Sequence, residues 1–262
     1  MPDSSSAASK AVSNSGPREV KSAVRTIAVL EFLAQRLGEP SSLKEIQEAI
    51  GAPRSSTHAL LQTLAAQRWV EVDRSGNQYQ VGIRALLVGT AFLDSDPLVR
   101  IVRPVIDDLS SDLGETVHLG RLDVDQMVYL ATYESRHYQR HVSRVGRRLP
   151  ASSTSLGKAV LSVRPEAFPD ELEPLTERSI TSPDELRKDL AATVSRGYAI
   201  DDEENTPGLK CFGVPLRYSN PVMDAISCSV PLSRLSSDRE QKIIEGLWRA
   251  QARIESSAPL VH

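Results

Sequence analysis

The residues whose types best suit contact with another molecule lie between positions 54 and 62. The apolar residues of this stretch recur at helical spacing: Thr57, Leu60, Leu61 and Leu64. The opposite side of the predicted helix carries small or hydrogen-bonding side chains and no acid: Ser55, His58, Ala59 and Gln62. Such a face suits the major groove of DNA, because bulk and negative charge would keep a helix away from the base edges. A solvated surface helix is the alternative that this stretch alone leaves open.

Two further stretches could bind a small polar molecule. Pro150–Lys158 places hydroxyls and backbone amides at the opening of a predicted helix, where the helix dipole attracts an anion such as a carboxylate. Simple N-capping by one serine is the alternative. In Ala225–Val230, strand alternation puts Ser227 and Ser229 on one face and Cys228 on the other. These serines point either into water or into a ligand cavity.

Acidic and thiol groups offer weaker chemistry. The run Asp201–Glu204 lacks the pattern of an oxygen-ligand loop, so a solvated turn is favoured over a metal site, and no metal or cofactor is predicted. Cys211 could act as a nucleophile with His118 or His141 as its base, but most free cysteines are small core residues. The five arginines and two histidines of Arg136–Arg148 are typical of a solvated basic edge that could also attract an acidic ligand.

The composition sets the frame for these candidates. A chain of 262 residues suggests two domains, and 40% hydrophobic with 25% charged residues is ordinary globular composition. The net charge of −3 argues against a bulk nucleic-acid coat, so any DNA binding must be local. Residues 1–90 hold ten Lys or Arg and eight Asp or Glu, whereas the remainder holds 21 and 26. The positive part of the chain therefore comes first.

Location follows from cysteines and hydropathy. The two cysteines do not form a disulfide framework or a zinc-finger pattern, which fits a reducing cytoplasm. The longest uncharged apolar run, Ala85–Leu93, is about half of the roughly 18 residues that span a bilayer, so no membrane contact is predicted. Residues 1–19 are Ser/Ala-rich without an apolar signal-peptide core and are expected to form a disordered leader.

Residues 20–82 have the pattern of a winged helix-turn-helix. A helix is predicted from Val20 to Leu37, a capping box at Ser42–Glu45 opens a second, and Gly51-Ala52-Pro53 separates it from a third that Ser55 or Ser56 would cap. Alternating residues then flank an Asp73–Asn77 turn, as in a two-stranded hairpin. At its tip, Arg74 and Asn77 could touch the DNA backbone or minor groove; a solvated turn is the alternative.

Residues 83–96 and 97–258 are expected to form a linker helix and a second domain. The apolar stripe of the linker, from Ile83 to Leu93, packs either on its own domain or on a second copy of the chain. Beyond it, a helix over Leu98–Leu113 ending at Gly114 precedes strand signals near Val117, near Met127 and at Val142 and Val145. Further helices are predicted at 155–163, 182–196 and 233–255, which together indicate an α+β domain.

Taken together, the motifs resemble the IclR family of bacterial transcription regulators. The resemblance runs from about Val20 to about Glu255 and rests on the order of several short motifs: Pro53–Thr57, Gly114–His118, Glu134-Ser135, Val145–Pro150, Leu156–Lys158, Arg196–Tyr198, Asp202–Glu204 with Gly208 and Cys211, and Ala225–Ser229. It implies a winged helix, a linker helix that mediates dimerisation and a GAF-like α/β effector-binding domain. It also implies a homodimer or homotetramer, a dimer of dimers, on a palindromic operator.

The resemblance assigns residues to the effector site and supports the DNA-binding residues predicted from the third helix and the hairpin. The DNA-binding set combines it with the reading of the third helix and the wing: Arg54, Ser55, Ser56, Thr57, His58, Gln62, Arg74 and Asn77. The effector set, for a small organic acid, is Ser155, Leu156, Asp201, Cys211, Ser227 and Ser229. Many family members have a His-rich or Gly/Ala-rich stretch where the helix beside the pocket begins, whereas this chain has Ala151–Ser155. The resemblance therefore does not imply which ligand is bound. The chain is thus expected to be a repressor of a catabolic operon and no enzyme; a hydrolase using Cys211 is the alternative.

Overall fold

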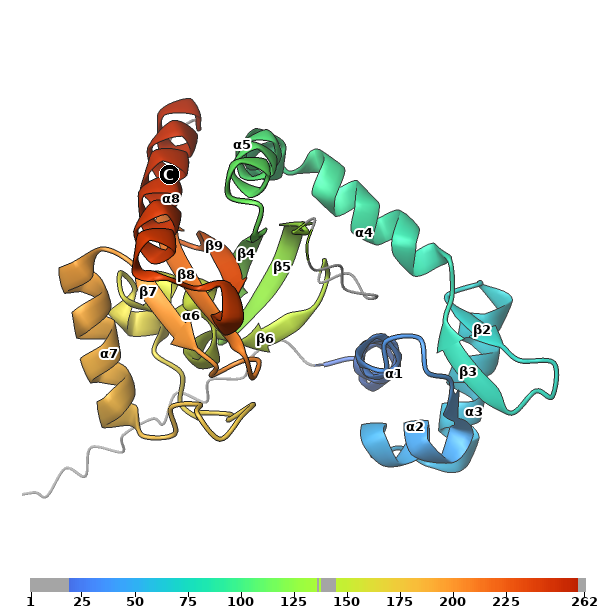
Figure 1. Ribbon diagram of the computed structural model, residues 1–262. Helices are drawn as coiled ribbons and strands as arrows, with labels where there is room; N and C mark the ends of the chain where they lie inside the picture. The colour runs from blue at the N-terminus through green and yellow to red at the C-terminus, as the bar shows by residue number, and fades with distance from the viewer. Residues whose placement is uncertain (1–18, 136, 138–144, 259–262) are drawn as a thin grey trace, which may run out of the picture. The chain divides into compact units, whose positions relative to one another are not determined.

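The computed structural model describes residues 19–135, 137 and 145–258 (Figure 1). Contacts divide the chain into two compact units, Met1–Val88 and Gly89–His262, and each is described by itself. The predicted leader lies almost wholly outside the described residues. Within the described part, no helix is both long and apolar enough to cross a membrane.

The first unit has three helices and a small antiparallel sheet. Its elements in chain order are α1 (Lys21–Gln35), β1 (Ser41–Ser42), α2 (Leu43–Ile50), α3 (Arg54–Ala66), β2 (Val70–Val72) and β3 (Gln78–Val81). The strand order is β1-β3-β2. The predicted helices and hairpin are confirmed, while the short strand β1 was not predicted because two serines carry no strand pattern. The core consists of Val29, Leu33, Ile46, Leu61, Leu64, Val70 and Tyr79.

Local signals fix where α2 and α3 begin and end. Ser42 Oγ accepts from the Glu45 amide at 3.3 Å, while Glu45 Oε2 accepts from the Ser42 amide at 2.7 Å, which confirms the capping box. Gly51 ends α2 with a φ of 59°, a conformation that glycine adopts without strain. The expected serine cap on α3 was wrong: α3 begins at Arg54, so both serines lie inside it and Pro53 precedes it without a side-chain cap.

Only some of the apolar residues of α1 are buried. Val29 and Leu33, one turn apart, are buried against α2 and β3, but Val24 and Ile27 are 46% and 56% exposed. A single helix buries only the side that meets its neighbours, so the apolar residues on its other sides stay exposed. α4 (Arg84–Ser95), at the predicted linker, likewise has no buried residue.

The second unit is built on one antiparallel six-stranded sheet with the order β6-β5-β4-β9-β8-β7. The strands are β4 (Thr116–Asp123), β5 (Gln126–Tyr133), β6 (Arg148–Pro150), β7 (Ala199–Asp202), β8 (Leu209–Leu216) and β9 (Asp224–Pro231). The helices are α5 (Pro97–Leu113), α6 (Ser155–Leu161), α7 (Pro183–Arg196) and α8 (Ser237–Ser257), with 3-10 turns at Ala151–Ser153, Pro165–Ala167 and Leu232–Arg234. The α+β class is confirmed.

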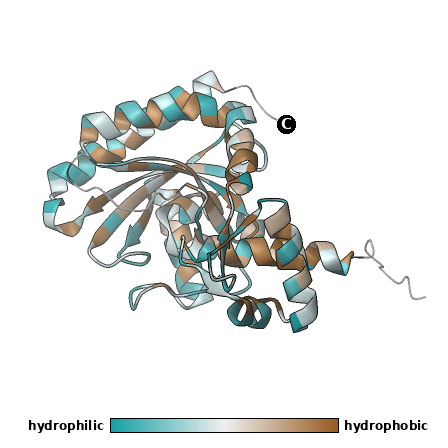
Figure 2. Cartoon of the chain, turned by 90° about the vertical axis from the view of Figure 1, so that its right-hand side faces the viewer, coloured by the Kyte–Doolittle hydropathy of each residue, from teal (hydrophilic) through white to brown (hydrophobic). Residues whose placement is uncertain are grey.

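Helices cover both faces of this sheet. One hydrophobic cluster joins α5 and α8 to Ile226, Cys228 and Val230 of β9, and another joins α6 and α7 to Ala225 of the same strand. The predicted alternation along β9 is therefore confirmed. In Figure 2 hydrophobic residues concentrate in the sheet, and hydrophilic and hydrophobic residues alternate along the helices that cover it. The face under α6 is the one that carries Ser227 and Ser229.

One strand expectation fails, at Val145. Val145 lies in a turn, and the strand β6 begins only at Arg148, where it pairs with β5. Val142 lies outside the described residues. By contrast, Gly114 ends α5 as predicted, with a φ of 66° and its amide bonded to the carbonyl of Ser110.

Candidate functional site

The outer side of α3 forms an exposed polar surface, here called the reading surface: Arg54, Ser55, His58 and Gln62. Leu61 and Leu64 on the inner side are buried in the core of the unit. The surface carries no acidic side chain, so it can approach the phosphate-lined major groove without repulsion. Arg74 and Asn77 are also exposed, at the turn between β2 and β3.

Thr57 does not belong to the reading surface, and its place in the predicted DNA-binding set is corrected. Its side chain is fully buried, and Thr57 Oγ1 donates to the carbonyl of Pro53 at 3.2 Å. The helical spacing with Leu61 and Leu64 already placed it on the inner face. Ser56 is half-buried and lies between the two sides.

The wing is held in shape by one carboxylate. Asp73 Oδ1 accepts from the amides of Asn77 and Gln78, both at 2.9 Å, and Ser75 Oγ donates to Oδ2 at 2.6 Å. The hydrogen bonds from Ser75 and the Gln78 amide lower the pKa of Asp73 to about 2. Because both carboxylate oxygens are occupied within the turn, the tip presents Arg74 and Asn77 instead.

In the second unit, sheet register aligns polar residues of four strands in one row. Asp201 on β7 pairs with Cys211 on β8, Cys211 pairs with Ser229 on β9, and Ser229 pairs with Thr116 on β4. Paired residues share a face of the sheet, so these four side chains lie on the α6 side. Cys211 Sγ lies 3.2 Å from Ser229 Oγ. Three predicted effector residues therefore come together, and Thr116 joins them.

A second row lies beside the first. Ser227 on β9 pairs with His118 on β4, and His118 pairs with Thr132 on β5, with 3.0 Å between His118 Nδ1 and Thr132 Oγ1. Ser227 and His118 are each 2% exposed, whereas Cys211 and Ser229 are half-buried. The two rows are here called the polar sheet face: Thr116, His118, Thr132, Asp201, Cys211, Ser227 and Ser229. Alternation along β4 and β5 could have revealed the members that the prediction missed.

The opening of α6 packs directly onto this face. A Cβ at Gly213, the partner of Ser227 in register, would lie 2.5 Å from the carbonyl oxygen of Ser155, so only glycine permits this approach. Thr154 caps α6 by accepting from the Gly157 amide at 3.0 Å. The plain capping alternative therefore describes the opening, with a threonine in place of the expected serine. Ser155 and Leu156 are buried, and Leu156 lies in the core cluster with Tyr129.

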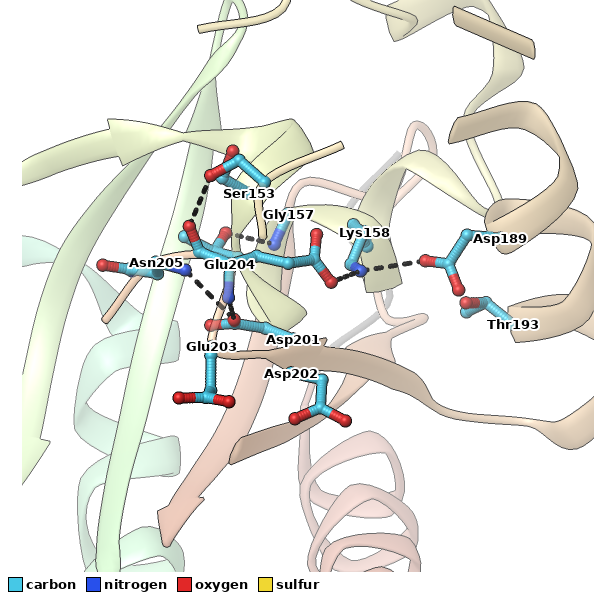
Figure 3. Close-up of polar contacts among 12 residues, drawn as sticks. Ser153, Gly157, Lys158, Asp189, Thr193, Asp201, Asp202, Glu203, Glu204 and Asn205 are labelled. Carbon is cyan, nitrogen blue, oxygen red and sulfur yellow. Dashed lines mark hydrogen bonds and ion pairs between the residues drawn. The ribbon is translucent and has the colours of Figure 1, made fainter. Parts of the chain in front are cut away.

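The acidic run Asp201–Glu204, which begins at the end of β7, is not a solvated turn, and that expectation was wrong. Asp201 and Glu204 are 2% and 6% exposed, and Glu204 and Asp189 flank the buried Lys158 of α6 (Figure 3). Lys158 Nζ lies 2.6 Å from Glu204 Oε1 and 2.9 Å from Asp189 Oδ2. Asp201 Oδ1 accepts from the amides of Glu204 and Asn205. The sequence contains no local sign that a lysine 46 residues away neutralises this run.

Burial perturbs both carboxyl groups. Desolvation raises the pKa of Glu204 to about 7, against the opposing effect of Lys158. It raises the pKa of Asp201 to about 6, although amide hydrogen bonds and Lys158 favour its charged form. The cluster thus holds more acid than one lysine neutralises, and it lies at the edge of the polar sheet face. Among the described residues, no group of His, Cys, Asp or Glu has the geometry of a metal site.

The proposed nucleophile and base are separated in the sheet. Cys211 lies on β8 and His118 on β4, with β9 between them, so two strand spacings of about 5 Å each, about 10 Å in all, separate their backbones. Cys211 contacts Ser229, and His118 contacts Thr132. His141 lies outside the described residues. The geometry does not assemble a Cys–His pair from Cys211 and His118.

A winged helix-turn-helix followed by a sheet domain with a polar inner face defines a class of two-unit DNA-binding regulators. Comparison with protein families gives the family. Residues 22–74 match the IclR helix-turn-helix domain, and residues 90–256 match the bacterial transcriptional regulator IclR C-terminal domain. The chain therefore belongs to the IclR family of bacterial transcriptional regulators.

Relatives support both parts. The transcriptional repressor IclR of Escherichia coli is 33% identical over 231 residues, which cover 84% of each chain. The fold matches the crystal structure of an IclR regulator from Alicyclobacillus acidocaldarius with a TM-score of 0.78 and 22% identity, covering 91% of this chain and 99% of that one. An IclR homologue from Microbacterium hydrocarbonoxydans, solved with 4-hydroxybenzoate, matches with a TM-score of 0.71 and 22% identity over 90% and 98% of the two chains.

Proposed function

We propose that this regulator represses a catabolic operon and that a small organic acid, bound on the polar sheet face, changes its affinity for the operator. One observation supports this most: the register that gathers Asp201, Cys211, Ser227 and Ser229 on one inner face beside α6. These are hydrogen-bonding groups in a mostly apolar surrounding, as small-molecule sites require. The homologue solved with 4-hydroxybenzoate shows that an aromatic acid suits one member of this fold.

The DNA contacts are assigned to the reading surface and the wing. Gln62 and His58 lie on the outer side of α3 at positions from which they would face base edges, and Arg54 at the helix start would contact a phosphate. Ser55, Ser56, Arg74 and Asn77 complete the proposed contacts. Thr57 supports the helix from inside.

A second copy of the chain is proposed to bind α4. Val88 and Phe92 are 57% and 50% exposed, one helical turn apart, and Ile83, Leu86 and Leu87 are also exposed. An apolar stripe on one helix is a common dimer contact, and a palindromic operator requires two reading surfaces. Phe92→Glu should convert a dimer into a monomer in light-scattering measurements and weaken operator binding. A monomeric wild type would contradict this assignment. We also propose that residues 83–96 form the linker, that the effector domain begins at residue 97 and that the protein is cytoplasmic.

The decisive test uses the DNA flanking the protein's own gene. Fluorescence anisotropy should show binding whose affinity falls steeply between 50 and 200 mM salt, roughly 10³-fold for about six phosphate contacts, because counterions return to the phosphates. A thermal-shift panel of 4-hydroxybenzoate, glyoxylate and pyruvate then searches for an acid that stabilises the protein and alters the DNA affinity. Flat salt dependence would refute DNA binding, and the absence of any response to organic acids would refute the proposed ligand class.

A further inference from the structure

Two largely buried carboxylates in the second unit share a single arginine. Asp224, at the start of β9, is 1% exposed, and Asp96, just before α5, has a side chain that is 9% exposed. Arg121 on β4 bridges them: its Nε and Nη2 lie 2.7 and 2.8 Å from the two oxygens of Asp224, and its Nη1 lies 2.5 Å from Asp96 Oδ2. The Tyr218 hydroxyl also donates to Asp224.

The two sides of this bridge belong to different parts of the unit. Asp96 follows α4 directly, and its Oδ1 caps α5 by accepting from the amides of Leu98 and Val99 at 2.9 and 3.1 Å. Although burial would raise the pKa of Asp96, Arg121 and these amides hold it below its ordinary value. The same carboxylate therefore begins α5 and fixes the point where the linker helix ends.

On its other side, the bridge is connected to the polar sheet face through β9, which carries Asp224, and β4, which carries Arg121. Asp224 lies on β9 three residues before Ser227, and the neighbour of Arg121, Gly120, lies under Leu156 of α6. A side-on arginine–carboxylate pair is planar and tolerates little displacement. A movement of β9 or α6 that follows ligand binding would therefore act on Arg121 and, through it, on Asp96.

We propose that Arg121 is a positioning residue that couples the polar sheet face to the end of the linker helix, by holding Asp224 and Asp96 on one guanidinium. The inference rests on the proposed function, since it concerns how a bound acid alters the operator affinity. Among the described residues, this ion-pair cluster joins the strand carrying Ser227 and Ser229 to the residue that follows α4. A purely structural anchor is the competing interpretation.

Asp96→Asn separates the two interpretations. Asparagine keeps an oxygen that can cap α5, but it removes the charge that binds Arg121. The matched control is Asp108→Asn. Asp108 also lies on α5, and its ion pair with Arg253 of α8 joins two side chains that are both more than half exposed. Arg121→Lys is the second variant, because an ammonium keeps the charge but lacks the fork that spans both carboxylates.

Two measurements complete the test. With the acid found in the thermal-shift panel, the ratio of operator Kd with and without the acid should fall at least fivefold towards 1 in Asp96→Asn and Arg121→Lys, while acid affinity stays within twofold. Asp108→Asn should keep the wild-type ratio. Without any acid, hydrogen exchange in Asp96→Asn should accelerate at least tenfold both at the amides of Leu98 and Val99 and in β9, at residues 224–229, relative to the wild type and to Asp108→Asn. Loss of stability with an unchanged Kd ratio, or faster exchange confined to the amides of Leu98 and Val99, would overturn the inference. A wild type whose DNA affinity responds to none of the acids would refute the proposed function, and the exchange result would still decide whether the bridge couples α5 to β9.

Discussion

The reading surface and the polar sheet face are both built from hydrogen-bonding side chains, but they are stabilised in opposite ways. Arg54, His58 and Gln62 are exposed and depend on an apolar inner face of α3 for their position. Asp201 and Ser227 are buried, and they depend on partners from other strands and from α6. A surface designed to meet a partner can remain unpaired in water, whereas a buried polar site must be satisfied within the fold.

The largest difference between the two regions should appear when a lysine is removed. Lys158→Met leaves Glu204 and Asp189 without their shared cation, and loss of one member of a buried ion pair costs about 3–5 kcal/mol. The matched variant in the first unit, Lys44→Met, breaks an exposed pair with Glu48 and should cost about 0–1 kcal/mol. Urea unfolding measures both. Equal losses would contradict the contrast between the regions.

The two regions should also respond to pH with opposite sign. The pKa of Glu204 is raised from 4.5 to about 7, so the folded state binds its proton more tightly, and stability falls as pH rises from about 4.5 to 7. The pKa of Asp73 is lowered from 3.8 to about 2, so its contribution is present above pH 4 and is lost as pH falls towards 2. Glu204→Gln should reduce the decline between pH 5 and 7, as measured by the urea midpoint, and the part that comes from the raised pKa of Asp201 should remain. Asp73→Asn should leave that decline unchanged and flatten only the acid side; the reverse assignment would refute both.

Base preference tests the reading surface itself. Gln62→Ala should lose about 1–3 kcal/mol of discrimination at one operator position, because a bidentate contact to adenine would disappear. Arg54→Ala should weaken binding to all sequences and reduce the salt slope by about one phosphate. Competition anisotropy with single-base operator variants separates the two effects. If Gln62→Ala weakened every variant equally, α3 would not be oriented as proposed.

The sequence allowed prediction of elements whose causes are local. The capping box at Ser42, the glycine ends of α2 and α5, and the alternation along β9 depend on neighbouring residues, and the structure contains all of them. Long-range partners could not be predicted: the acids at 201–204 look solvated until Lys158 is placed beside them. Which apolar residues of α1 are buried could not be predicted for the same reason, because it depends on the contacts with α2 and β3.

The smallest expected effect concerns Thr57, whose buried side chain supports α3 from the inner side of the helix. Because its side chain is buried and donates to Pro53, Thr57→Val keeps the shape but removes one hydrogen bond, which should cost about 0.5–1.5 kcal/mol of stability. Operator affinity and salt slope should stay within twofold of wild type, because no exposed atom of α3 changes. Ser55→Ala, two residues nearer the start of the helix and on its exposed side, is the control and should lose DNA affinity without losing stability. If the Thr57→Val protein folded normally but lost base preference, Thr57 would contact DNA, and its removal from the DNA-binding set would be wrong.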